Sequence, residues 1–177
     1  MKKCAFLFSV LCFSILNAQT DKNVEEHQVQ IGLPMPAILY EKGISNNSTL
    51  SLEAVTGFEL RGCTGCETQY GIRAILRGQY RYYYNLERRI TKGKNISGNT
   101  GNYVGGLMLV QFGNPIIGDI QRPDIFGVGP VYGIQRTYRR GFFYRLEGGV
   151  AYLEDGFGSG VGLILAARIG WVLRKRR

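Results

Sequence analysis

The stretch "RAILRGQYRYYYN", residues 73–85, decides the fold because three arginines recur at every fourth position among apolar and aromatic side chains. Both a helix and a strand would place Arg73, Arg77 and Arg81 on one side. The positions between them distinguish the two. Every even position from 70 to 84 is uncharged, whereas the odd positions carry the arginines. This period of two, rich in tyrosine, favours a strand over a helix.

Such a strand, residues 70–85, is much longer than the usual five to six residues, and it has one apolar and one cationic face. Further runs with the same alternation cover residues 28–41, 49–61, 103–112, 125–138, 142–153 and 161–173. Long strands that follow one another, with small or charged residues on one face, are typical of outer-membrane barrels. The sequence therefore predicts an all-β fold, an antiparallel up-and-down transmembrane β-barrel of about eight strands.

Seven runs conflict with the even strand number of single-chain bacterial barrels. Either one run is two strands, or a strand lies in one of two other segments, residues 22–30 or 114–120. Pro34 and Pro36 predict an edge, bulge or bend inside the first run, because proline cannot donate to a strand ladder.

The segment 86–102 predicts a helical turn at residues 86–91, followed by a loop rich in glycine and asparagine. It lies outside the cell if the first strand starts in the periplasm. It lies in the periplasm if the short turn at 139–141 does so, as short turns normally do. The orientation in the membrane stays open at this point.

The first residues predict export. Lys2 and Lys3 precede an apolar run over residues 5–16, and Ala18 ends a plausible cleavage site, which is the layout of a secretory signal peptide. The run is too short for a membrane-spanning helix, and the alternative is a buried N-terminal helix. We expect a signal peptide at residues 1–18 and an outer-membrane barrel domain at residues 19–177.

The net charge of the chain is +9, and removal of Lys2 and Lys3 with the signal peptide lowers it to +7. An exported protein does not usually meet nucleic acid, and many arginines lie inside apolar strands. We therefore expect outer-membrane lipid or lipopolysaccharide as the partner rather than nucleic acid, and no protein partner is indicated. Candidate contacts to anionic lipid are Arg88, Arg89, Lys92 and Lys94, each worth about 1 kcal/mol near a charged surface. The alternative is a solvated basic loop.

The polar faces of the strands predict a charged interior. The residues expected to point into the barrel are Glu53, Glu59, Arg61, Arg73, Arg77, Arg81, Arg145, Glu147 and Arg168. An eight-stranded barrel is only just wide enough for side chains, so these charges must pair, and the interior is expected to be plugged rather than an open pore. Aromatic residues expected at the membrane interfaces are Tyr80, Tyr82, Tyr84, Tyr138, Phe142, Tyr152 and Trp171.

Cys63 and Cys66 form the sharpest local motif. In an oxidising compartment they predict a disulfide across a turn, and the alternatives are a redox pair or half of a zinc site. The only histidine is His27, and no Ser/His/Asp set is suggested by spacing. We therefore expect no cofactor, no metal and no enzymatic activity.

Two segments carry a resemblance to a known group of proteins. Residues 81–109, "RYYYNLERRITKGKNISGNTGNYVGGLML", and residues 129–152, "GPVYGIQRTYRRGFFYRLEGGVAY", resemble the small outer-membrane β-barrel proteins of Bacteroidetes-type Gram-negative bacteria, in the OmpA/OmpX-like class. The resemblance implies a membrane-embedded barrel and brings no catalytic or binding residues with it. The chain departs from the pattern at its end, where Trp171 is followed by "VLRKRR".

The expected function is that of an integral outer-membrane protein with a structural or surface-interaction role. One alternative is a secreted soluble barrel of lipocalin type that binds a small apolar ligand, which would invert the two faces of each strand. The other is a barrel enzyme that modifies lipid A.

Overall fold

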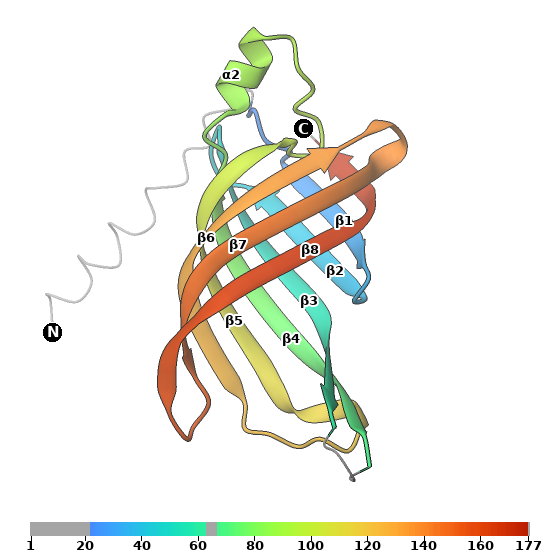
Figure 1. Cartoon of the computed structure of the whole chain (residues 1–177). Helices are drawn as coiled ribbons and strands as arrows, with labels where there is room; N and C mark the ends of the chain where they lie inside the picture. The colour runs from blue at the N-terminus through green and yellow to red at the C-terminus, as the bar shows by residue number, and fades with distance from the viewer. Residues whose placement is uncertain (1–21, 63–66, 177) are drawn as a thin grey trace, which may run out of the picture.

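The protein is a closed barrel of eight antiparallel strands, each paired with its neighbours in sequence (Figure 1). A computed structural model describes residues 22–62 and 67–176. The strands are β1 (His27–Leu33), β2 (Ala37–Gly43), β3 (Ser48–Arg61), β4 (Gln69–Tyr82), β5 (Gly101–Gly118), β6 (Ile125–Thr137), β7 (Phe142–Glu154) and β8 (Ser159–Arg176). Pairing of β1 with β8 closes the ring. The predicted all-β, up-and-down barrel is thus confirmed, and residues 1–18 lie outside the described part.

The eighth strand arises because the run 28–41 is two strands, β1 and β2. The chain reverses at residues 34–36, and the Leu33–Pro34 peptide is cis. Of the two segments considered for the missing strand, 22–30 contributes only the start of β1, and 114–120 mostly belongs to the end of β5. Because of this reversal, residues of β2 with odd numbers point inward, whereas those of β1 with odd numbers point outward. Ala37 and Leu39, predicted to share the outward face with Val29, are buried inside the barrel.

The segments that connect the strands agree more closely with the predictions from the sequence. The predicted helical turn is α2 (Leu86–Thr91), and the short turn after β6 contains a 3-10 helix, η1 (Arg139–Gly141). The predicted strand 103–112 is too short, because β5 begins at Gly101 and continues to Gly118. Its register against β4 shifts around Arg73, which lets the two strands stay paired to Gly118.

The barrel has two unlike rims. The start of β1, the end of β8, η1 and the long loop with α2 lie at one end, the terminal rim (Figure 1). The loops 119–124 and 155–158 lie at the other end, the distal rim. The loop 86–102 and the turn 139–141 therefore share one rim. The first strand, β1, starts at this same rim, so a periplasmic start of β1 and a periplasmic turn at 139–141 both place the loop 86–102 in the periplasm. The two sequence cues conflicted only because the run 28–41 was counted as one strand.

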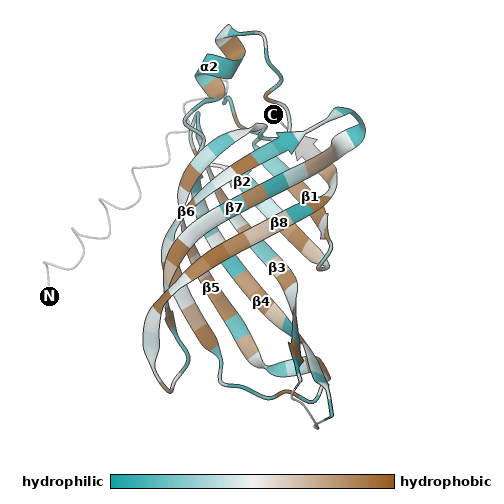
Figure 2. Ribbon diagram, in the orientation of Figure 1, coloured by the Kyte–Doolittle hydropathy of each residue, from teal (hydrophilic) through white to brown (hydrophobic). Residues whose placement is uncertain are grey.

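Hydrophobic and hydrophilic residues alternate along the strands (Figure 2). The hydrophobic members are mostly exposed on the outside, and the polar members are mostly buried inside. Period-two alternation follows from the pleat, and closure of the sheet turns its two faces into an outside and an inside. Exposed outward side chains include Ile38, Leu50, Leu52, Leu76, Met108, Val128, Leu146, Val150, Leu163 and Leu165. Buried inward side chains include Gln28, Gln30, Glu41, Glu53, Arg73, Arg77, Gln79, Arg81, Gln135, Arg145 and Glu147.

The wall is complete only in the half next to the terminal rim. The β1–β2 hairpin is short, and its last pairs are Ala37 with Val55 on β3 and Leu33 with Ile169 on β8. Beyond them, residues 56–61 of β3 and 159–168 of β8 have no regular strand partner on the side of the hairpin among the described residues. Beyond the last pair, the Thr56 N–H donates to Pro36 O at 3.1 Å and the Thr56 hydroxyl donates to it at 3.5 Å. We call the gap between these two strand edges the notch.

Candidate functional site

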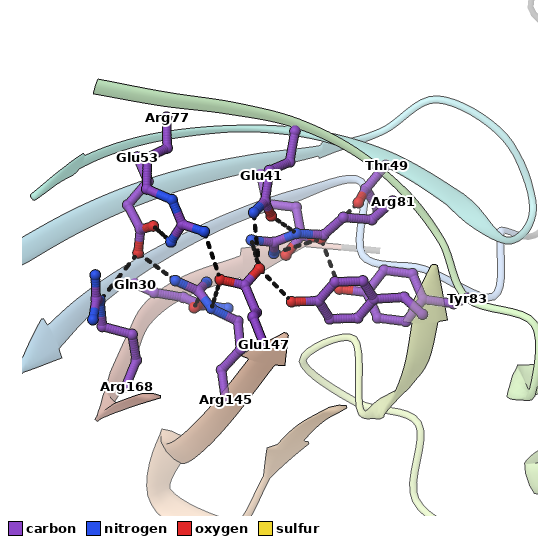
Figure 3. Close-up of polar contacts among 12 residues, drawn as sticks. Gln30, Glu41, Thr49, Glu53, Arg77, Arg81, Tyr83, Arg145, Glu147 and Arg168 are labelled. Atoms are coloured by element: carbon purple, nitrogen blue, oxygen red, sulfur yellow. Dashed lines mark hydrogen bonds and ion pairs between the residues drawn. The ribbon is translucent and has the colours of Figure 1, made fainter. Parts of the chain in front are cut away.

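The interior of the complete half is built around two carboxylates, Glu53 on β3 and Glu147 on β7 (Figure 3). Arg77 bridges them, donating to Glu53 at 2.8 Å and to Glu147 at 3.0 Å. Arg145 donates to the other oxygen of Glu53, and Gln79 donates to Glu147 at 2.9 Å. The alternation of β3, β4 and β7 points these side chains at one another, and the resulting pairs offset the cost of burying their charges.

A second group of contacts, centred on Arg81, lies toward the terminal rim. Arg81 is fully buried, with Glu41 at 3.5 Å and Glu147 at 3.7 Å from its guanidinium nitrogens. Its guanidinium carbon lies 5.0 Å from the centre of the Tyr103 ring, within the range of a cation–π contact. The Tyr103 hydroxyl donates to Glu147 at 2.7 Å. Aromatic faces and two carboxylates thus surround this cation.

Glu41 completes this part of the network. Thr49 donates to it at 2.6 Å and Tyr83 at 2.9 Å. The prediction from sequence missed Glu41, because it treated residues 28–41 as one strand and placed this parity on the outer face. If Pro34 and Pro36 are recognised as part of a hairpin turn, Glu41 is assigned to the inward face of the second strand.

The nine predicted interior residues fall into three groups. Glu53, Arg73, Arg77, Arg81, Arg145 and Glu147 are buried inside the barrel. Glu59 is partly exposed near the distal rim, where it lies 3.4 Å from Arg73 and also pairs with Arg122. Arg168 lies 3.7 Å from Glu53 beside the notch. Arg61 is exposed, so its assignment to the interior is wrong: β3 ends there, where there is no longer a filled interior for it to enter.

The terminal rim is closed by its own segments. The backbone N–H of Glu25 donates to the Asn99 side chain, and the Gly98 N–H donates to the Glu25 carboxylate, both at 2.7 Å. Gly98 and Asn99 both have positive φ, which brings this loop back over the barrel. Below them, the buried side chains Val24 and Leu86 pack with the Tyr83 and Tyr103 rings.

The exterior carries aromatic side chains near both rims. Those near the terminal rim include Tyr40, Tyr80, Tyr82, Tyr84, Tyr132, Tyr138, Phe142 and Trp171, and those toward the distal rim include Phe58, Tyr70, Phe112, Phe126 and Tyr152. Aliphatic residues occupy the wall between them (Figure 2). Tyr70 and Tyr80 on β4 are ten residues apart, which corresponds to ~33 Å along the strand. For a strand tilted by about 40° from the barrel axis, this length spans ~25 Å along the axis.

The basic residues of the long loop do not all have the same role. Arg88, Lys92 and Lys94 are exposed. Arg89 instead donates to the Asn95 carbonyl, with its Nη2 at 2.8 Å, and holds the loop in shape. Partial burial, and then the Arg136 guanidinium, lower the pKa of Arg89 below the usual arginine value. We therefore keep Arg88, Lys92 and Lys94 as the candidates for lipid contact.

Other candidate chemistry has less support. Cys63 and Cys66 lie outside the described residues. Among residues 22–62 and 67–176, no three His, Cys, Asp or Glu side chains gather in a way that could hold a metal ion. The same residues contain no helix that is both long and apolar enough to cross a membrane. His27 contacts the Tyr40 hydroxyl at 2.6 Å on the outer surface.

No protein-family model, no curated protein and no solved structure matches this chain.

Proposed function

We propose that the protein is an integral outer-membrane β-barrel with a structural or surface-interaction role rather than an enzymatic one. The carrying observation is the division of the strands into an uncharged apolar exterior and an ion-paired interior. Strands can cross a bilayer only as a barrel that pairs their backbone groups, as the eight strands of the complete half do, and such a barrel needs this division of side chains. The sequence resemblance to small Bacteroidetes-type outer-membrane barrels agrees with this role.

The apolar wall has suitable dimensions for a bilayer. The ~25 Å between Tyr70 and Tyr80 along the barrel axis equals the usual height of the apolar band of such barrels. Tyrosine and tryptophan suit the headgroup level, because one end of the ring can be dry while the other is wet. A soluble barrel of this exterior would expose a far larger apolar patch to water than soluble monomers do.

The interior of the complete half is suited to rigidity rather than transport. Arg81 and Arg145 are among its largest fully buried side chains, and their partners fill the space between opposite strands. The exposed cations Arg88, Lys92 and Lys94 then provide a contact surface for anionic lipid at the terminal rim. Surface interaction would therefore take place at that rim, while the barrel anchors it.

The two faces are tested with nitroxide labels on cysteines placed at Leu76 and Arg77, in a chain whose own cysteines are replaced by serine. In lipid vesicles we expect the label at 76 to collide with oxygen, which partitions into the bilayer, and not with a water-soluble nickel chelate. The label at 77 should collide with neither, and a label at Lys92 should respond to the chelate. A label at 76 shielded from both agents would instead favour the lipocalin-type assignment.

Localisation is tested by fractionation of cells that make the full chain. The protein should remain with the outer membrane through high-salt washing and be released only by detergent. Recovery of folded protein from the soluble periplasmic fraction would exclude the membrane role.

A further inference from the structure

The notch leaves part of the barrel wall open to the side. The outward leucines Leu163 and Leu165 of β8 are 78% and 81% exposed, whereas Leu146 on the neighbouring β7 is 49% exposed. The difference arises because no described segment pairs with the other side of β8 at this height. The short β1–β2 hairpin therefore ends above a gap between two strand edges (Figure 1).

An apolar groove of about 530 Å³ occupies the region around the tip of this hairpin. Its lining combines both faces of the wall. Ile38, Leu76 and Trp171 lie on the outer face of the wall. Gly32, Val55 and Ile75 occupy positions on the inward face of their strands. The small side chains of Ala54 and Ala74 leave a depression in the outer surface next to the notch. The groove thus leads from the apolar exterior toward the interior.

Arg168 lies on the inner side of this passage. It is 12% exposed, and its aliphatic chain packs against Gly32, which also lines the groove. Its Nε has no hydrogen-bond partner among the described residues, and its Nη1 donates only to the Ala167 carbonyl. The nearest carboxylate, Glu53 at 3.7 Å, already accepts hydrogen bonds from Arg77 and Arg145. Arg168 is therefore a guanidinium at the edge of the notch whose Nε can donate to an additional anion.

We propose that the notch binds one long-chain fatty acid, with the alkyl chain in the groove and the carboxylate on Arg168. The site goes beyond the proposed membrane role and rests on it, because the groove opens into the apolar band. In a bilayer the chain gains little from leaving lipid, so the charge-assisted hydrogen bond must supply the selectivity.

The depth of Arg168 argues for a fatty acid rather than a phospholipid. Arg168 precedes Trp171 by three residues on β8, which is ~10 Å along the strand and therefore below the aromatic belt. A single-chain carboxylate can descend to that level. A phospholipid phosphate would have to take its headgroup and second chain with it.

The experiment uses Trp171, the only tryptophan of the chain, as the reporter. The full barrel is reconstituted in phosphatidylcholine vesicles at pH 9, where the fatty acid is ionised. Trp171 fluorescence is measured with trace amounts of brominated stearic acid, its methyl ester, or brominated phosphatidylcholine. We expect saturable quenching by the acid at a concentration at least about 10-fold below that needed for the ester, which cannot pair as an anion with Arg168.

Three variants locate the site. Arg168→Gln should raise the half-saturating concentration of the acid to that of the ester, and Arg168→Lys should restore part of the difference. Ala54→Phe fills the groove without touching the charge network, so it should abolish saturable quenching even if the Arg168 variants fold poorly. Val128→Phe, on the outer face of β6 away from the groove, should bind as the unmodified chain does.

The two proposals fail in different ways. Equal quenching by acid and ester, or an unchanged response of Arg168→Gln, overturns the fatty-acid site while the membrane role stands. If vesicles made entirely of brominated phosphatidylcholine do not quench Trp171, the residue is not in the bilayer, and both proposals are wrong.

Discussion

The two halves of this barrel share six strands and differ in almost everything else. Next to the terminal rim, eight strands surround a buried network in which Glu53 and Glu147 are shared among arginines. Toward the distal rim the hairpin is missing, and inward side chains such as Leu153 and Ile164 are apolar and only half-buried. The complete wall encloses a whole network of charges. The interrupted wall retains the buried Arg73, which donates to the Ile120 carbonyl of the distal loop and lies 3.4 Å from Glu59, and it gains lateral access.

The rims differ in charge as well. Exposed or partly exposed cations at the terminal rim include Lys42, Arg88, Arg89, Lys92, Lys94, Arg139 and Arg140, against the acids Glu26 and Glu87. The distal rim carries the acids Glu59, Glu67, Asp119, Asp124, Glu154 and Asp155, against Arg61 and Arg122. An anionic surface will therefore favour the terminal rim.

The largest expected effect concerns the carboxylates of the two halves. Glu147→Gln should lower the free energy of unfolding by about 3–5 kcal/mol, because it leaves Arg77 and Arg81 buried with one fewer counter-charge. Glu154→Gln, at the exposed distal end of β7, should cost less than about 1 kcal/mol. Urea titration of the barrel in lipid vesicles measures both. Equal losses would mean that the two halves do not differ in dielectric environment.

A smaller effect is expected from packing. The Tyr103 ring occupies the space where a side chain on Gly133 would lie, whereas no atom lies within 4 Å of the corresponding position at Gly160. Gly133→Val should therefore destabilise the barrel by about 1–3 kcal/mol by overpacking. Gly160→Val in the distal half should be neutral in the same urea titration. A neutral Gly133→Val would show that the terminal half is less tightly packed than we describe.

The smallest effect concerns the charge of the rims. Lys92→Gln should weaken the binding of phosphatidylglycerol by about 1 kcal/mol, because an exposed cation at the terminal rim is lost. Arg61→Gln is the matched control at the distal rim, where Glu67 and its acidic neighbours already repel the lipid. Native mass spectrometry of lipid retained by each variant gives the comparison. A greater loss with Arg61→Gln than with Lys92→Gln would contradict the assignment of the lipid surface to the terminal rim.

Strand periodicity was sufficient to predict most of the interior. The alternation over residues 70–84 placed Arg73, Arg77 and Arg81 on one face, and these arginines are buried inside. The assignment of inward and outward faces was wrong after residues 34–36, because the reversal of the chain there was not recognised from the sequence. Glu41 was therefore missed. Arg61 had the inward parity but lies at the end of its strand, and parity alone carries no information on where the filled interior ends.

The sequence by itself determined the class of the fold, because period-two alternation over long segments can satisfy an apolar and a charged environment only on opposite faces of a sheet. Tertiary structure decided which charges meet. Arg145 and Glu53 are 92 residues apart in sequence and are brought together only by closure of the ring. It also decided the position of the notch, because the height of the wall depends on how far the β1–β2 hairpin reaches between β8 and β3. That reach is a property of three-dimensional pairing and not of any one strand.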